Sequence, residues 1–291
     1  MRRKRIRIDH ENTWYHCYNR IAGEEGELPF GDGEKQKIIQ LVKRLCGLYT
    51  VRVVALQTMG NHFHILLQAP NQPPTPEEVC QRYNRYYKDR KITPDSEECA
   101  IWQGRCRDIS WFMRHFQQNF SIWYNNSRSV PRRGPVWASR FKSTILESGK
   151  AVWQCLQYIE NNPARAGICK DPATYLFGTH GIWHGSGKHM FEYNIRTYLL
   201  PMLEGLFGPI TLAKLQRMLD QALADKTGRS PTDTSLFATL DRRMRFWTHG
   251  VVIGSKEFIR QTMQDHRQSR IIESRIKKMD DASLAAWFVP A

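Results

Sequence analysis

The stretch VRVVALQTMGNHFHILLQA, residues 51–69, decides the fold. Both of its halves are rich in β-branched and aliphatic residues, and the pair Gly60-Asn61 between them is typical of a tight turn. The stretch therefore predicts a β-hairpin. A further strand is predicted at 13–21 (TWYHCYNRI), where aromatic and β-branched residues precede the turn-rich AGEEG.

Outward from the hairpin, helical and extended patterns alternate. Apolar residues at helical spacing predict helices over 34–48 and over 108–126, the second with Asp108 as its N-cap and an aromatic stripe that belongs to the core. A strand is predicted at 136–146, and a helix at 150–161 that ends before a proline. This order predicts an α+β fold with a ferredoxin-like (RRM-like) antiparallel sheet and helices on one face.

The remaining segments predict two additions to this core. Residues 70–100 are rich in proline and charge, and we expect a surface insertion around one helix. The composition changes near residue 188, so we expect one domain over 1–188 and a mainly helical C-terminal extension over 189–291, whose role is open. A turn is expected at HGVVIGS (249–255).

The charge balance narrows the class of partner. Lysine and arginine number 43 against 28 aspartates and glutamates, a net charge of +15 with a pI near 9.7. Between 100 and 170, eleven basic residues face three acids, a net charge of +8. This charge favours nucleic acid over a membrane surface. A basic protein without a nucleic-acid role stays open.

Other bulk features favour a cytoplasmic location. No apolar run approaches the roughly 18 residues of a membrane span. The basic N-terminus, MRRKRIRIDH, lacks the apolar segment of a signal peptide. Seven cysteines, an odd number without a CxxC pair, predict free thiols in a reducing compartment. We expect a cytoplasmic protein that does not contact membranes.

His62 and His64 are the first candidate site. Alternate residues of a strand share a face, so the two imidazoles project together and form half of a metal site. The apolar Ile65 and Leu66 that follow indicate a buried strand, where histidines are costly unless they are used or paired. Two histidines satisfied at a sheet edge remain the alternative.

Tyr158 and Asn162 are the second candidate site. They lie four residues apart, hence on one helical face, and Asn162 precedes Pro163 at the helix end. A tyrosine can form a covalent phosphoryl intermediate, and an amide oxygen can complete a metal shell. The alternative is a tyrosine packed on the core and an asparagine that ends its helix.

Four ordered segments resemble the single-tyrosine HUH (His-hydrophobic-His) endonucleases, in particular the REP-associated tyrosine transposases. They are WYHCYNR (14–20), MGNHFHILL (59–67), GPVWASRFKS (134–143) and YIENNPARAG (158–167). At positions 60 and 164, where this chain has glycine and alanine, the family commonly has proline and valine. The histidine pair precedes the tyrosine, as in the transposases and unlike the relaxases.

The resemblance implies a metal-dependent DNA transposase or nickase. A divalent cation, Mg²⁺ or Mn²⁺, would be held by His62, His64 and Asn162 and would polarise the scissile phosphate. Tyr158 would attack single-stranded DNA, leaving a 5′-phosphotyrosine link and a free 3′-OH that can reverse the step. A phenol with a pKa of about 10 needs a metal or a base, and no residue stands out as the base.

The same resemblance, together with the basic central segment, indicates the DNA-binding residues. They are expected to be Asn19, Arg20, Arg132, Arg133, Trp137, Arg140, Lys142 and Arg165. Four of these, Arg132, Arg133, Arg140 and Lys142, are the best candidates for phosphate contacts. Trp137 would either stack on a base or belong to the core.

The implied partner is single-stranded DNA that carries a hairpin, a palindromic repeat, at the bacterial nucleoid. A homodimer and a monomer both fit the sequence. One other class is a domesticated nucleic-acid-binding protein on the same fold without catalysis, which the intact His62, His64 and Tyr158 oppose. Another is a zinc hydrolase built on the histidine pair, which lacks a third ligand nearby in sequence and leaves Tyr158 unexplained.

Overall fold

The computed structural model describes residues 8, 11–24, 27–129, 133–227, 246–264, 276–279 and 284–288. Within them a seven-stranded sheet has the order β2-β3-β1-β4-β5-β7-β6. Its first four strands in the chain are β1 (Thr13–Arg20), β2 (Arg52–Thr58), β3 (His62–Ala69) and β4 (Lys142–Leu146). They pair antiparallel in the order β2-β3-β1-β4. The predicted hairpin and the ferredoxin-like α+β fold are confirmed.

Two helices cover one face of this sheet. They are α1 (Asp32–Cys46) and α4 (Ile109–Asn126), and the predicted N-cap of α4 is present, since the Asp108 carboxylate accepts from the Ser110 N–H at 2.6 Å. The α4 aromatic stripe packs with Phe63 in the main hydrophobic core, where Phe112, Phe116 and Phe120 are fully buried. The core role predicted for this stripe is confirmed.

Helices also cover the opposite face of the sheet. The prediction of helices on one face only is therefore wrong. α5 (Lys150–Glu160) contacts β2 and β3 there, and Leu66, Trp14 and Val152 belong to a second buried cluster. The physical reason is that several strands carry apolar side chains on this face, among them Trp14, Leu66 and Leu146, and these need cover. This second layer places α5 over the even-numbered residues of β3.

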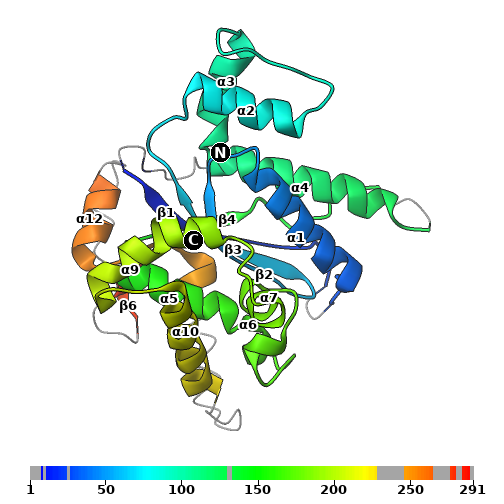
Figure 1. The fold of residues 1–291 in the computed structure, drawn as a ribbon. Coiled ribbons are helices and arrows are strands. Elements are labelled where there is room, and N and C mark those ends of the chain that lie inside the picture. Colours follow the sequence, from blue (N-terminus) through cyan, green and yellow to red (C-terminus); the bar gives the residue numbers. More distant parts are fainter. Residues whose placement is uncertain are drawn as a thin grey trace.

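The 70–100 insertion also differs in detail. It contains α2 (Pro76–Tyr86) and leads into α3 (Glu97–Cys106), so two helices stand where one was expected. Thr75 and Ser96 cap them by accepting from the N–H groups of Glu78 and Cys99. Both helices lie beside α4 at one end of the molecule (Figure 1).

The C-terminal extension contributes strands as well as helices. β5 (Gly250–Gly254) pairs parallel with β4, and β7 (Ala285–Phe288) and β6 (Ile276–Lys278) continue the sheet. The turn expected at 249–255 is therefore wrong. Its Val-Val-Ile run is typical of a strand, and its pairing partner lies about a hundred residues earlier in the chain.

The remaining elements are mostly short helices. Their bounds are α6 Asn162–Arg165, η1 Pro172–Thr174, α7 Thr179–Ser186, α8 Glu192–Asn194, η2 Ile195–Leu199 (a π-helical turn), α9 Leu200–Phe207, α10 Leu212–Thr227 and α12 Lys256–Gln264. Residues 246–249 are also helical. Among the helices of the described residues, none is long and apolar enough to cross a membrane.

Candidate active site

The strand register brings polar side chains together on the face that α5 covers. His62 and His64 lie on the same face of β3 as Leu66, which packs in the α5 cluster. On β1, Tyr18 pairs with His64 and Arg20 pairs with His62. Directly paired residues of antiparallel strands point to the same face, so both histidines face α5 with β1 side chains beside them.

α5 places Tyr158 against His64, one member of this histidine pair. The ring centroids of His62 and His64 lie 5.1 Å apart, and the Tyr158 ring lies 5.5 Å from that of His64. His64 is 1 % exposed and Tyr158 is 7 % exposed. The structure thus brings together the two candidate sites that the sequence places almost a hundred residues apart.

His16 determines which nitrogen of His64 carries the proton. His16 Nδ1 lies 3.0 Å from the Trp247 carbonyl oxygen, so this nitrogen donates its hydrogen. In the neutral ring Nε2 is then an acceptor, and it lies 2.9 Å from His64 Nδ1. His64 therefore donates from Nδ1, and its Nε2 keeps the lone pair that a metal ion would use.

His62 is oriented in the same way by its neighbour in the turn. The Asn61 amide nitrogen donates to the Glu27 carbonyl at 3.0 Å, which fixes the amide orientation. Asn61 Oδ1 then lies 2.6 Å from His62 Nδ1 and accepts its hydrogen. Both histidines of the pair thus keep the lone pair on Nε2, which is the arrangement common to metal-binding imidazoles.

Burial keeps these imidazoles neutral. It lowers the pKa of His16 to about 4, against a smaller opposing effect of its hydrogen bond to Trp247. Burial, with the charge of Arg20, lowers the pKa of His62 to about 4. Burial also lowers the pKa of His64 well below its usual value, helped by His16 and His62. At neutral pH each ring therefore has one proton and one lone pair.

Asn162 lies one helical turn beyond Tyr158. Its amide nitrogen donates to the Tyr158 carbonyl oxygen at 2.9 Å, so the amide donor is turned toward its own helix. The oxygen is the atom left for other contacts, and an amide oxygen is a suitable metal ligand. Two imidazole nitrogens and one amide oxygen therefore fit the donor set of a divalent cation such as Mn²⁺.

Tyr158 is a buried phenol beside a cation. Burial raises the pKa of Tyr158 to about 12, while Arg165 opposes this rise through its charge and a hydrogen bond. The Arg165 guanidinium lies 5.0 Å from the centre of the Tyr158 ring. The phenol is fully protonated at neutral pH, so any attack by this oxygen requires removal of its proton.

The C-terminal extension takes part in this cluster through Trp247. Its indole stacks on the Tyr158 ring with centroids 5.4 Å apart and an angle of 24°. Its carbonyl oxygen accepts from His16, and Thr144 of β4 also contacts it. A residue more than 85 positions beyond Tyr158 therefore covers the tyrosine with its indole and accepts the His16 hydrogen bond with its backbone carbonyl.

Several predicted DNA-binding cations lie at the His62 end of the sheet. Arg20 pairs with His62 and Lys142 pairs with Tyr18. Burial, and to a smaller extent the charge of Arg20, lower the pKa of Lys142. The 133–141 loop runs beside the end of β1, since the Ala138 N–H donates to the Arg20 carbonyl. Arg133 and Arg140 of this loop are exposed.

Two other predicted DNA-binding residues have structural contacts. Asn19 is buried and donates to the Ser139 carbonyl at 3.0 Å, which holds the loop against β1. Trp137 packs edge-on against Phe63 in the main core, and its indole donates to the Gln117 carbonyl. Of the two open roles for Trp137, these contacts favour the core. Arg132 lies outside the described residues.

Sequence reasoning missed His16, Asn61 and Trp247. For His16 a signal exists, because residues 16, 18 and 20 share one face of a predicted strand, but facing His64 depends on a register that only the folded sheet fixes. For Asn61 the sequence predicts only a place in a turn. Trp247 lies far along the chain, and no local pattern connects it with this site.

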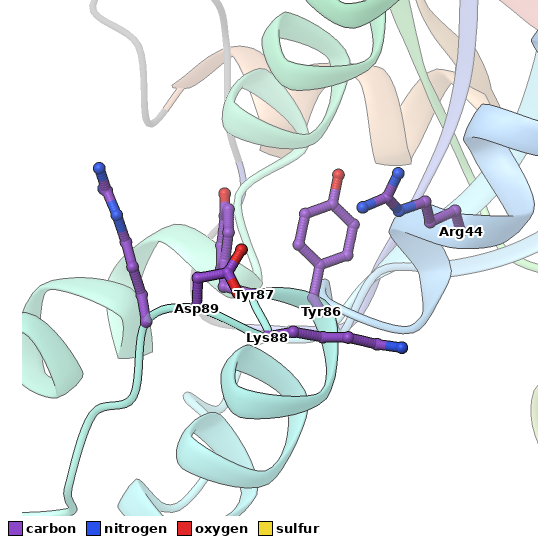
Figure 2. Close-up of a pocket in the computed structure, with 6 residues that line it drawn as sticks. Arg44, Tyr86, Tyr87, Lys88 and Asp89 are labelled. Carbon is purple, nitrogen blue, oxygen red and sulfur yellow. The ribbon is translucent and has the colours of Figure 1, made fainter.

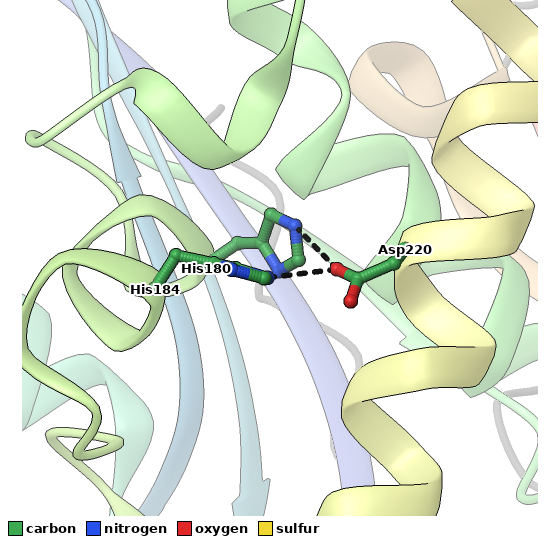
Figure 3. A group of neighbouring side chains, drawn as sticks. All are labelled: His180, His184 and Asp220. Atoms are coloured by element: carbon green, nitrogen blue, oxygen red, sulfur yellow. Dashed lines mark hydrogen bonds and ion pairs between the residues drawn. The ribbon is translucent and has the colours of Figure 1, made fainter.

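Two further features lie apart from the Tyr158 cluster. His180, His184 and Asp220 place one ligand atom each within 4.8 Å of one another, a group that could hold a metal ion (Figure 3). A hollow of about 350 Å³ is lined by Arg44, Tyr86, Tyr87, Lys88, Asp89 and Arg90, and Arg44 points toward the Tyr86 ring (Figure 2). The hollow is formed by α1 and the insertion, which pack on the other face of the sheet.

Comparison with known proteins adds a structural likeness. No protein-family model and no curated protein matches the chain. The chain is similar to a solved structure described as a REP-associated tyrosine transposase bound to a REP hairpin. The two share 14% sequence identity over 64% of this chain and 87% of that chain, with a TM-score of 0.42. At this identity and TM-score, function has to be inferred from the residues of the site.

Proposed function

We propose that the protein is a metal-dependent endonuclease and strand transferase, a transposase of the single-tyrosine HUH type. Its substrate would be single-stranded DNA that carries a hairpin. The observation that supports this most strongly is the contact of Tyr158 with His64, one of two adjacent neutral imidazoles that each have a hydrogen-bonded Nδ1 and a lone pair on Nε2. The experiment that tests it is trapping of a covalent protein–DNA adduct, described in the Discussion.

In this proposal His62, His64 and Asn162 would hold a Mg²⁺ or Mn²⁺ ion, which would supply positive charge to polarise the scissile phosphate. Tyr158 Oη forms a bond to phosphorus while the bond from phosphorus to the 3′ oxygen breaks. The phenol loses its proton, and the departing 3′ oxygen gains one to become a hydroxyl. The 5′-phosphotyrosine conserves the phosphodiester energy, so attack by a 3′-OH reverses the step and joins strands.

Arg165 supports this chemistry from beside the tyrosine. Its positive charge lowers the pKa that burial raises, and so favours the phenolate needed for attack. Arg20 and Lys142 add positive charge at the His62 end of the sheet, where we place the DNA backbone. In this placement Arg20 and Lys142 act on the phosphate charge, whereas Arg165 acts on the phenol.

A domesticated DNA-binding protein without catalysis is the second candidate. The stacking of Trp247 over Tyr158, which is 7 % exposed, is the observation that favours it. A zinc hydrolase on the histidine pair is disfavoured. Among the described residues no third histidine, cysteine or carboxylate forms a compact group of ligand atoms with both His62 and His64, and the nearby His16 instead accepts the His64 Nδ1 hydrogen. Both the transposase and the non-catalytic DNA-binding protein would act in the cytoplasm at the nucleoid, as a monomer or a homodimer.

His16 should act as a positioning residue for His64. Replacing His16 with alanine removes the acceptor of the His64 Nδ1 hydrogen, and we expect metal affinity and cleavage to fall about 10–100-fold. Glutamine can both accept from His64 and donate to the Trp247 carbonyl, so His16→Gln should recover much of the loss. The measurement is a Mn²⁺ titration of cleavage for the three proteins. If His16→Ala and His16→Gln lowered metal affinity and cleavage equally, His16 would have only a structural role.

DNA binding should depend steeply on salt, because phosphate contacts release counterions. Each contact on single-stranded DNA contributes a log–log slope of about −0.7. Removing Arg132 and Arg133 together should therefore flatten the slope by roughly 1 to 1.5 and weaken hairpin and unstructured strands alike. Binding of both strand types across a salt series measures this.

The matched control for this double variant removes two exposed cations from the hollow on the other face. Lys88→Ala with Arg90→Ala changes the net charge equally and should leave the slope unchanged. An unchanged slope in the Arg132–Arg133 variant would mean that this loop faces away from DNA. A loss confined to hairpin strands would mean that the loop reads structure.

A further inference from the structure

We propose that His180, His184 and Asp220 form a second metal site, for Zn²⁺ or a similar divalent transition-metal ion, separate from the Tyr158 cluster. His180 and His184 lie four residues apart on α7, so both project from one face of that helix. Asp220 comes from α10, which belongs to the C-terminal extension. Figure 3 shows the three side chains converging between the two helices.

The spacing of the ligand atoms fits a tetrahedral ion. Asp220 Oδ1 lies 3.3 Å from His180 Nε2 and 2.8 Å from His184 Nε2. In a zinc site with bonds of about 2.0–2.1 Å, neighbouring ligand atoms lie roughly 3.3 Å apart. The three atoms therefore need only small movements to surround an ion, and a water molecule would complete four ligands.

The chemistry of the three ligands selects the class of ion. Imidazole nitrogen suits zinc and its transition-metal neighbours, whereas Mg²⁺ prefers an all-oxygen shell. The His180 side chain is 2 % exposed, so it lies at the buried end of the group. The side chains of His184 and Asp220 are 31% and 39% exposed, which gives an ion a path from solvent.

The location of the site indicates its effect. The residue before His180 is Thr179, whose hydroxyl bonds to the Glu160 carboxylate of α5, and the His180 N–H donates to the same carboxylate at 3.2 Å. Glu160 follows Tyr158 by two residues on α5. An ion that joins α7 to α10 would therefore connect the extension to the helix that carries the candidate nucleophile.

The same arrangement would arise without an ion if the ring N–H groups of His180 and His184 both donated hydrogen bonds to Asp220 Oδ1. Asp220→Asn distinguishes the two explanations, because an asparagine still accepts a hydrogen bond but lacks the charge that binds a cation. Asp171→Asn is the matched control. The Asp171 charge also acts on His180, and its own capping contact to the Ala173 N–H survives in asparagine, but Asp171 is not one of the three ligands.

The test uses the full chain with His62→Ala and His64→Ala, so that the other candidate metal site cannot contribute. After treatment with a chelator, Zn²⁺ is titrated in competition with a chromophoric chelator, and Tm is measured with and without Zn²⁺. We expect one equivalent of Zn²⁺ to bind and to raise Tm. Asp220→Asn and, separately, His184→Asn should weaken binding more than about 100-fold and abolish the rise in Tm. Asp171→Asn should do neither.

Failure to bind Zn²⁺ in a folded protein would overturn the proposal, as would unchanged binding in both ligand variants. His184 is partly exposed, so His184→Asn keeps the test valid if Asp220→Asn fails to fold. This result is independent of DNA cleavage, because the readouts are Zn²⁺ affinity and Tm.

Discussion

Replacing Tyr158 with phenylalanine is expected to abolish covalent attachment to DNA and to lower cleavage by at least about 10⁴-fold, as loss of a covalent nucleophile does in other enzymes. The substitution removes only the hydroxyl. The ring contacts with His64 and Trp247 do not need that oxygen, so folding and DNA binding should stay nearly unchanged. The measurement is a denaturing gel of labelled, hairpin-bearing single strands after reaction with Mn²⁺.

Tyr18→Phe is the matched control for this experiment. The Tyr18 ring stacks on His64 with centroids 4.9 Å apart, on the same face of the sheet as Tyr158. Both substitutions thus remove one phenolic hydroxyl beside the same imidazole. The account predicts that adducts persist in Tyr18→Phe and are lost in Tyr158→Phe. An adduct that survives in Tyr158→Phe would assign the nucleophile to another residue.

Loss of either histidine of the pair is the second large effect that we expect. His62→Ala and His64→Ala should each lower metal-dependent cleavage by more than about 100-fold, because changes to residues that merely support a metal ligand already cost 10–100-fold. A Mn²⁺ titration of the cleavage rate measures this. Asn162→Ala should have a smaller effect, since a neutral amide is the weakest of the three ligands.

His64 is buried, so its loss could act through folding instead. His64→Asn leaves less of a cavity, and Tm and DNA affinity should be measured beside the rate. His115→Ala controls for loss of a histidine from the other face, where His115 contacts Tyr49 on the side of α4. A normal response to Mn²⁺ in either His62→Ala or His64→Ala would contradict a shared metal site.

The parts of the fold that local pattern determines were predictable. The β2–β3 hairpin follows from two apolar runs around Gly60-Asn61, and α4 follows from Asp108 and the aromatic stripe behind it. β5 was not predictable in this way, because its parallel partner β4 lies far away in the chain. The Val-Val-Ile run has the composition of a strand, but three such residues between glycines are too few to predict one without that partner.

The candidate site also has a part that local spacing predicts and a part that depends on tertiary structure. The i, i+2 spacing of His62 and His64 and the i, i+4 spacing of Tyr158 and Asn162 put each pair on one face of its element. The two faces meet because α5 packs on the sheet, and local spacing does not determine that packing. The proton position on His64 depends on His16 and on the Trp247 carbonyl, which only tertiary structure brings into reach.

The involvement of Trp247 gives the C-terminal extension a role at the site. Its indole covers Tyr158, and its carbonyl ends the hydrogen-bond chain to His64. We propose that the extension positions the tyrosine and the histidine pair as well as extending the sheet. The division of the chain near residue 188 remains a prediction, and β5 shows that residues on both sides of it share one sheet.

The central claim is a metal-dependent phosphotyrosine link at Tyr158, and mapping the adduct tests it most directly. Full-length protein is incubated with hairpin-bearing single strands and Mn²⁺, digested with protease and nuclease, and analysed by mass spectrometry. The account predicts one nucleotide-bearing peptide, modified at Tyr158, joined to a 5′ phosphate and absent when a chelator is present. The released strand should carry a 3′-OH that a polymerase extends. An adduct on another residue, an adduct that forms without a divalent metal, or DNA binding with no adduct on any strand would contradict it.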